Sequence, residues 1–314
     1  MTRGPQRSDA GKRIGSDIMK RPIVDAHYHL WDPQAEAYPW LDGPPYPASV
    51  AGDVAAIAKP YLIEDYLADS SSFDVRKTVH VEAGCQDLVA ETAFVSEQAD
   101  KAGISTAIVA GAELQDPEFP RKLERQSRFP QLRGVRQVLN WDPNPHFTFT
   151  DRSDYMEDAQ WLRGFRLLRR YDLSFDLQVY PWQLEGAAQL AKQFPDTLMI
   201  LNHAGMPLHQ HGIGMQSWRS GLRTFAACDN AAVKISGLGM MNWNWTTDSI
   251  RPYALETIEI FGVNRCMFAS NFPVDRLYSP FDRLFRAFEQ IVGEFSETEQ
   301  VKLFSSNAER LYRF

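Results

Sequence analysis

Apolar residues along this chain fall into short runs that alternate with segments in which they recur at helical spacing. The short runs predict strands over Pro22–His29, Lys77–Ala83, Ser105–Gly111, Leu132–Asn140, Ser174–Tyr180, Thr197–His203, Ala232–Gly237 and Arg265–Asn271. The longer segments predict helices over Glu91–Ala102, Asp154–Tyr171, Leu184–Phe194, Met215–Cys228, Pro252–Phe261, Phe281–Glu294 and Thr298–Arg313.

Strands that alternate with helices imply βαβ units and a parallel sheet. Eight such strands in one chain predict an α/β protein with a (β/α)8 TIM barrel and long strand-to-helix loops. An open doubly wound sheet is the alternative, although no GxGxxG or Walker loop follows any strand. The segments Trp31–Pro60 and Trp141–Arg152 predict long loops after the first and fourth strands. Loops that follow strands build the active-site face of a barrel.

The chain of 314 residues is predicted to hold one barrel domain over residues 21–314. The polar, basic segment Met1–Lys20 lacks the apolar core of a secretory signal and is predicted to be a flexible tail. Three scattered cysteines, Cys85, Cys228 and Cys266, form neither a disulfide framework nor a CxxC site. A reducing, cytoplasmic compartment is therefore expected.

Composition narrows the class of partner. Hydrophobic residues make up 44% and charged residues 23%, as in soluble globular proteins. The net charge is −7, whereas proteins that bind nucleic acid or anionic lipid carry an excess of basic residues, so neither partner is expected. The longest apolar runs are strand-sized, so no membrane span is expected. A small-molecule substrate is the expected partner, and the composition leaves open whether the chain forms a homo-oligomer.

The alternation of side chains predicts which residues share a strand face. On most strands one face is apolar, which suits packing against the outer helices, and the other is polar or ionisable. On the first strand the alternation predicts that one face carries Val24, Ala26 and Tyr28 and the opposite face carries Asp25, His27 and His29. Burying polar groups without partners costs ~2–7 kcal/mol each. Several strands that aim polar groups at one place therefore predict a wet or ligand-filled cavity.

Three histidines are predicted to meet at the carboxyl ends of the strands. His27 and His29 lie two residues apart on the first strand, so their imidazoles share a face. Such a pair suits either a metal ion or a hydrogen-bonded substrate. His203 at the end of the sixth strand adds a third imidazole. Together the three would make a Zn²⁺ or Mn²⁺ site with an open position.

Five short motifs together resemble the amidohydrolase superfamily, and more narrowly its amidohydrolase-related lactonase branch. That branch includes pyrone-dicarboxylate lactonase, fuconolactonase and sulfomuconolactone hydrolase. The motifs are Val-Asp25-Ala-His27-Tyr-His29-Leu-Trp31, Gly134-Val-Arg136, Asn202-His203-Ala-Gly, Val-Lys234-Ile-Ser236-Gly and Phe-Ala-Ser-Asn271-Phe-Pro273-Val. The resemblance runs from about Arg21 to the last helix, where Asn307-Ala-Glu-Arg-Leu-Tyr is a typical ending.

The resemblance implies roles for several residues. His27 and His29 match the first-strand pair, His203 matches the sixth-strand histidine, and Arg136 matches an arginine that holds a substrate carboxylate or carbonyl. Asn271 stands where the family commonly has an aspartate that binds metal and acts as general base. A neutral amide cannot take the proton of the attacking water. It can still accept a hydrogen bond from water or offer its oxygen to a metal.

The metal content stays open at this point. The fifth strand carries Gln178 where binuclear members have histidine, and the fourth strand has no lysine that could be carbamylated. The resemblance therefore implies at most one divalent metal, Zn²⁺ or Mn²⁺, held by His27, His29 and His203. Some lactonases of this branch work without metal.

Several groups are candidates for the general base. His80 and Glu82 near the end of the second strand face the cavity by alternation, opposite Val79 and Val81. Histidine is the natural base near neutral pH, although His80 also suits a core position with a fixed tautomer. Asp275 and His203 are further candidates. Three loop histidines, His146, His209 and His211, are expected to be exposed.

Aromatic side chains and methionine predict the character of the substrate. Several of them follow strands on the presumed catalytic face and are expected to bind substrate: Tyr180, Trp31, Trp141, Trp182, Trp243 and Met240. They favour an apolar or ring-shaped ligand. The alternative for each tryptophan is that it anchors a loop or buries a subunit contact.

The function predicted from the sequence is hydrolysis of a lactone or related cyclic ester, apolar or aromatic-derived, by attack of water on the carbonyl. Two alternatives remain. One is a single-metal decarboxylase or hydratase of an aromatic acid on the same barrel. The other is a non-catalytic binding protein that has lost the last-strand acid.

Overall fold

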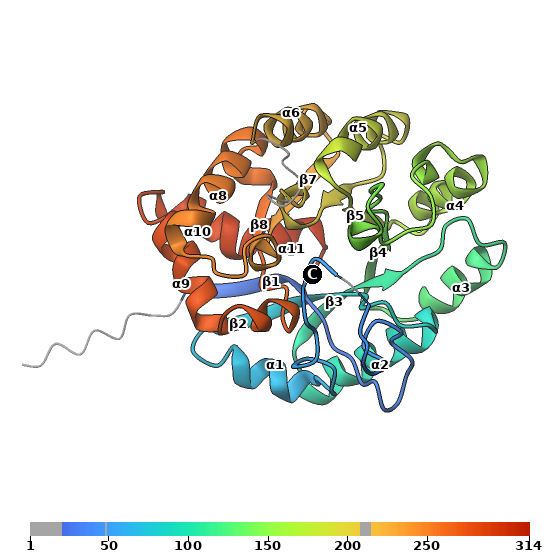
Figure 1. The fold of residues 1–314 in the computed structure, drawn as a ribbon, viewed down its shortest axis with the longest axis horizontal. Coiled ribbons are helices and arrows are strands. Elements are labelled where there is room, and N and C mark those ends of the chain that lie inside the picture. The colour runs from blue at the N-terminus through green and yellow to red at the C-terminus, as the bar shows by residue number, and fades with distance from the viewer. Residues whose placement is uncertain (1–20, 48, 208–214) are drawn as a thin grey trace, which may run out of the picture.

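The computed structural model describes residues 21–47, 49–207 and 215–314. These residues form a ring of eight parallel strands with helices around it (Figure 1). Strand order follows the chain, from β1 beside β2 to β7 beside β8. The strands are β1 (Pro22–Tyr28), β2 (Asp74–Val81), β3 (Ser105–Gly111), β4 (Leu132–Val138), β5 (Ser174–Gln178), β6 (Met199–Leu201), β7 (Ala231–Ile235) and β8 (Cys266–Phe268). The predicted (β/α)8 barrel is confirmed. The predicted tail and the loop residues His209 and His211 lie outside the described residues.

Hydrogen bonds beyond the end of β8 tie it to β1. The backbone N–H of Asn271 donates to the carbonyl of His27, and the N–H of His29 donates to the carbonyl of Phe272, both at 2.7 Å. Tyr28 and Phe272 also form a parallel bridge. The two motifs that carry the histidine pair and Asn271 are thereby brought together at the carboxyl ends of the strands.

The helices include α1 (Ile63–Asp69), α2 (Leu88–Ala102), α3 (Phe119–Gln126), α4 (Ala159–Arg170), α5 (Leu184–Gln193), α6 (Met215–Ala226), α7 (Leu238–Met241), α8 (Thr247–Phe261), α9 (Phe281–Ile291), α10 (Glu297–Val301) and α11 (Asn307–Leu311). Three of them, α1, α3 and α7, are too short to show a clear period and were not predicted. Helix α8 begins before Pro252, at a capping box that Thr246 forms with Ser249. The predicted last helix is instead α10 and α11 joined by a π-helical segment, Lys302–Ser306. No helix in the described ranges has both the length and the apolar run that crossing a membrane would take.

The interior of the barrel is lined by small apolar side chains over much of the ring. One cluster joins strands from opposite sides, which only inward-facing side chains can do: Val24, Ala26, Val79, Val81, Ala107, Val109, Ile200, Ala232, Met267 and Ala269. The end of the chain packs against it through Ala308, Leu311 and Tyr312. The expectation that apolar faces turn towards the helices is therefore wrong for β2 and for Val24 and Ala26 of β1. Val79 and Val81 point inward, and His80 between them points towards the helices.

A bulge in β1 changes the predicted alternation. Asp25 pairs with Thr78 and Tyr28 with His80, so three steps along β1 match two along β2. The Tyr66 hydroxyl of α1 donates to the Asp25 carboxylate at 2.8 Å, and the rings of Tyr28 and Tyr66 lie 4.4 Å apart. Asp25 and Tyr28 thus both face α1, contrary to the prediction that they lie on opposite faces. The bulge leaves His27 and His29 together on the inner side.

Candidate active site

A cavity of about 470 Å³ opens where the strands end. Six of the predicted site residues line it: His29, Trp31, Arg136, His203, Met240 and Asn271. The two long loops predicted after β1 and β4 contribute further walls, among them Trp40 and Phe149. The volume is that of a pocket for a small molecule.

The three histidines converge at the floor of this cavity, which His29 and His203 line. The Nε2 atoms of His27 and His29 lie 3.2 Å apart, and the rings of His27 and His203 have centroids 4.7 Å apart. Simple alternation along β6, with Ile200 inside, would turn His203 outward. A left-handed backbone at His203 (φ 55°) and Ala204 (φ 50°) redirects the imidazole inward. Such conformations cost about 1–3 kcal/mol each and cluster at functional sites.

Hydrogen bonds assign the protons of the histidine pair. His29 Nδ1 lies 2.7 Å from the carbonyl oxygen of Val81, so it carries the proton and Nε2 holds a lone pair. His27 Nε2 then donates to His29 Nε2, and the lone pair on His27 Nδ1 faces the Lys234 ammonium at 3.5 Å. Burial lowers the pKa of His29 to about 3, and burial likewise lowers the pKa values of His27 and His203 well below the usual value. All three imidazoles are therefore neutral at neutral pH.

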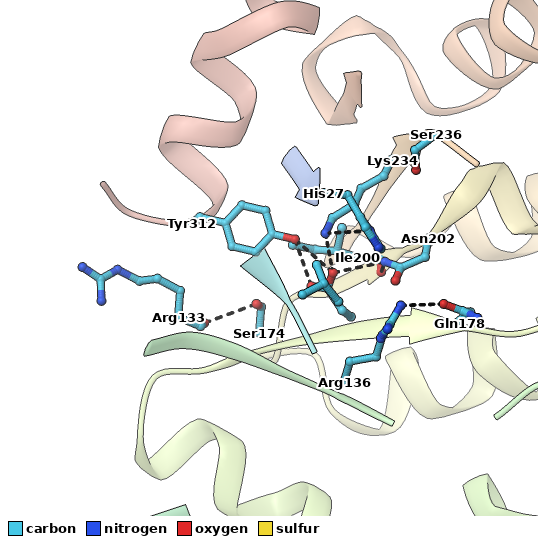
Figure 2. Close-up of polar contacts among 12 residues, drawn as sticks. His27, Arg133, Arg136, Ser174, Gln178, Ile200, Asn202, Lys234, Ser236 and Tyr312 are labelled. Carbon is cyan, nitrogen blue, oxygen red and sulfur yellow. Dashed lines mark hydrogen bonds and ion pairs between the residues drawn. The ribbon is translucent and has the colours of Figure 1, made fainter. Parts of the chain in front are cut away.

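A buried polar network contacts His27 through Lys234 (Figure 2). Lys234 donates to Asp176 at 2.5 Å, and both side chains are completely buried. Asp176 also accepts from the Tyr312 hydroxyl at 2.9 Å and from the Asn202 amide at 3.1 Å. Burial lowers the pKa of Lys234 to about 8. The members come from β5, from the residue after β6, from β7 and from the end of the chain. Sequence spacing therefore could not have revealed this network.

Asn271 is held between the cavity and a buried carboxyl group. Its backbone is left-handed (φ 57°), and its Nδ2 donates to Asp275 Oδ2 at 2.6 Å. This bond orients the amide, so that Oδ1 lies 3.3 Å from His29 Nε2 at the cavity. Asp275 also accepts from the backbone N–H of Gly239 at 3.1 Å, and burial raises the pKa of Asp275 to about 7. Asp275 does not line the cavity, so it acts on the site through Asn271.

Arg136 reaches the cavity from β4 and is paired there. Its Nε donates to Glu82 Oε1 at 2.6 Å, and its Nη2 donates to the backbone carbonyl of Glu82 at 2.5 Å. Its Nη1 donates to Gln178 Oε1 at 2.7 Å (Figure 2). Guanidinium carries five N–H donors, so two remain for a ligand.

Two tryptophans and a tyrosine predicted to bind substrate hold loops together instead of lining the cavity. The Tyr180 hydroxyl donates to the Phe147 carbonyl at 2.7 Å, and its ring stacks on Trp182 at 4.6 Å. Trp182 in turn donates to the carbonyl of Trp141 at 3.1 Å. Trp40 and Phe149, which do line the cavity, were missed, although both lie in the two loops that the sequence marked as long.

Two other predicted site residues lie away from the cavity walls. Trp243 is 49% exposed and donates to the Val50 carbonyl at 3.2 Å, which holds its loop against the long loop after β1. His80 is buried on the helix side of β2, with its ring 5.6 Å from that of Tyr28. The prediction that alternation turns His80 towards the cavity is therefore wrong. Burial lowers the pKa of His80 well below its usual value.

The residues present were tested for their fit to one metal ion. Separations of 3.2 and 3.3 Å between His27 Nε2, His29 Nε2 and Asn271 Oδ1 match the edge of a tetrahedron with bonds of ~2.0–2.1 Å. The donor set is nevertheless incomplete. Within the described ranges, no three His, Cys, Asp or Glu side chains gather in an arrangement suited to a metal ion. His203, predicted as the third ligand, packs its ring on His27 with the centroids 4.7 Å apart and turns Nδ1 to Ser236. The donor that lies 3.3 Å from His29 Nε2 is instead a neutral amide oxygen, and the Lys234 ammonium is 3.5 Å from His27 Nδ1. The residues do not fit a resident metal centre.

Comparisons with known proteins agree with the motifs. The amidohydrolase family model matches residues 24–314. The uncharacterized protein y4mH of Sinorhizobium fredii is 43% identical over 297 residues, which cover 93% of this chain and 98% of that protein. An L-fucono-1,5-lactonase of Burkholderia multivorans is 27% identical over 305 residues, which cover 92% of this chain and 95% of that protein. A solved structure of an amidohydrolase from Burkholderia multivorans, with bound zinc, superposes with a TM-score of 0.79 at 24% identity, covering 93% of this chain and 99% of that one.

Proposed function

This chain belongs to the amidohydrolase family, as its motifs predicted, and we propose that it is a hydrolase that opens a lactone or related cyclic ester. The observation that carries the proposal is the convergence of His27, His29 and His203 at the floor of one cavity, beside Arg136 and Asn271. The similarity to a named lactonase supports the reaction class. The apolar walls of the cavity support a substrate with an apolar or aromatic body.

In this proposal two donors polarise the lactone carbonyl. His203 Nδ1 lies 2.9 Å from the Ser236 hydroxyl, and the proposal takes the tautomer in which this hydroxyl donates to Nδ1 and Nε2 carries the N–H that faces the cavity. Arg136 adds its two remaining N–H groups from β4. Donors fixed in advance stabilise the negative charge that develops on the carbonyl oxygen, and each is typically worth a factor of about 10²–10³ in rate.

In the proposed complex the attacking water replaces the His27 N–H at the single lone pair of His29 Nε2, and its other proton is donated to Asn271 Oδ1. As the water oxygen bonds to the carbonyl carbon, one water proton passes to His29 Nε2. Because the pKa of His29 is about 3, the imidazolium is a strong acid and gives the proton to the ring oxygen as the C–O bond breaks. The product is the open hydroxy acid. Asn271 positions the water, and the hydrogen bond from His29 Nδ1 to the Val81 carbonyl fixes the orientation of His29.

A panel of lactones and cyclic esters tests the proposal, with the purified protein assayed before and after treatment with a chelator. We expect ring opening that adds one water to the substrate mass. Loss of CO2 from an aromatic acid would instead support a decarboxylase on the same barrel. Binding of ligands without turnover of any panel member would support a non-catalytic protein and contradict the proposal.

A further inference from the structure

Resting on the proposed lactonase function, we infer that Glu82 restricts the substrate to uncharged lactones by neutralising Arg136. The Arg136 and Glu82 side chains are each 7% exposed and form an ion pair at 2.6 Å. The second carboxylate oxygen of Glu82 accepts from the backbone N–H of Gly84 at 2.7 Å. Both oxygens of Glu82 are therefore engaged by N–H donors.

The other described residues that line the cavity add no charge. Among the described residues that line it, Arg136 and Glu82 are the charged ones, and His29 and His203 are neutral. Glu91 lies behind Glu82, and burial together with the Glu82 charge raises the pKa of Glu91 well above its usual value. A substrate carboxylate placed on the free N–H groups of Arg136 would meet the Glu82 carboxylate at close range. Like charges in such a site oppose binding.

The shape and lining of the cavity agree with an uncharged ligand. Its walls include Trp31, Trp40, Phe149, Met206 and Met240, which offer ring faces and polarisable surface. Two N–H groups of Arg136 suit a carbonyl oxygen, which needs a donor and no counter-charge. The substrate class is therefore a neutral lactone with an apolar or aromatic ring.

The test compares kcat/KM for 3,4-dihydrocoumarin with that for the same ring bearing a carboxylate. We expect the wild type to favour the neutral lactone by about tenfold or more. Glu82→Gln, which keeps the shape and removes the charge, should raise the relative use of the carboxylated lactone by about tenfold. Glu309→Gln is the control, because Glu309 is 41% exposed and pairs with Lys77 away from the cavity. It should leave the ratio unchanged.

Binding of the corresponding lactams, measured by calorimetry, separates this inference from the proposed function. Lactams are not expected to turn over, so their affinities report on charge selection even if no lactone is hydrolysed. A wild type that prefers the carboxylated lactam or lactone would overturn the inference. So would a folded Glu82→Gln variant with an unchanged ratio. If this variant does not fold, the wild-type preference alone decides.

Discussion

Substitution of Gly237 offers a sharp test of the position of His203. Gly237 follows β7 with a left-handed backbone (φ 62°, ψ 16°). A Cβ added there would lie 2.6 Å from His203 Nδ1, 2.8 Å from His203 Cγ and 2.7 Å from Met240 Cε. Unbonded heavy atoms favour separations of about 3.5–4.0 Å, so the imidazole has to move by about 1 Å. The bond between His203 and Ser236 is then lost or lengthened.

The chain offers a matched control at Gly103. This residue has nearly the same backbone (φ 64°, ψ 23°), and an added Cβ meets nothing within 4 Å. Both Gly→Ala changes therefore carry the left-handed strain of about 1–2 kcal/mol. Gly237→Ala alone displaces a proposed catalytic group. A misplacement of about 1 Å can cost on the order of 10²-fold in rate.

The assay is kcat/KM on the best lactone of the panel, with urea unfolding of both variants. We expect Gly103→Ala to lose stability and keep its activity, while Gly237→Ala loses stability and about 10²-fold in kcat/KM. Equal kcat/KM for the two folded variants would refute the reasoning, because it would show that turnover does not depend on where His203 lies.

Other changes test the buried groups and the metal. Asn271→Asp places a second carboxylate 2.6 Å from that of Asp275 and should lower the free energy of unfolding at pH 8 by about 2–3 kcal/mol. The double variant Asn271→Asp/Asp275→Asn should recover most of this loss, and no recovery would contradict the pairing of the two side chains. The folded pKa of Asp275, about 7, is above its unfolded value of 3.8, so its contribution to stability is lost as pH rises from about 4 through 7. Relative to Asp275→Asn, the free energy of unfolding of the wild type should fall by up to ~4 kcal/mol over that pH window, as measured by urea titration. A difference between the two proteins that does not change with pH would contradict this assignment. Lys234→Met leaves Asp176 buried without its cation and should cost about 3–5 kcal/mol in thermal unfolding, whereas Lys101→Met at an exposed ion pair should cost at most about 1 kcal/mol. Dialysis against EDTA should leave kcat/KM unchanged, and a loss that zinc restores would contradict the metal-fit conclusion.

The barrel was predictable from the sequence because strand and helix periods alternate along the whole chain. Strand ends were less predictable. The sixth strand was expected to run to His203, yet β6 ends at Leu201. The chain then turns through left-handed residues that no apolar pattern signals. Tertiary contacts, such as the bond between His203 and Ser236, decide this turn.

The histidine cluster was predicted partly for the wrong reason. Alternation alone would have turned His203 outward, and it did not foresee the bulge in β1 that places Tyr28 beside α1. What located the histidines correctly was their place at strand ends, where a parallel barrel gathers its functional groups. Pairings between distant strands, such as Lys234 with Asp176, depend on coordinates and had no signal in the spacing.

The central claim is that the histidines at the cavity floor catalyse the opening of a lactone. The most direct test is kcat/KM of a folded His203→Ala variant on the best lactone of the panel, with its unfolding free energy measured alongside. The account predicts a loss of about 10²–10³-fold in kcat/KM with a far smaller change in stability. Turnover equal to that of the wild type in a folded variant would contradict it.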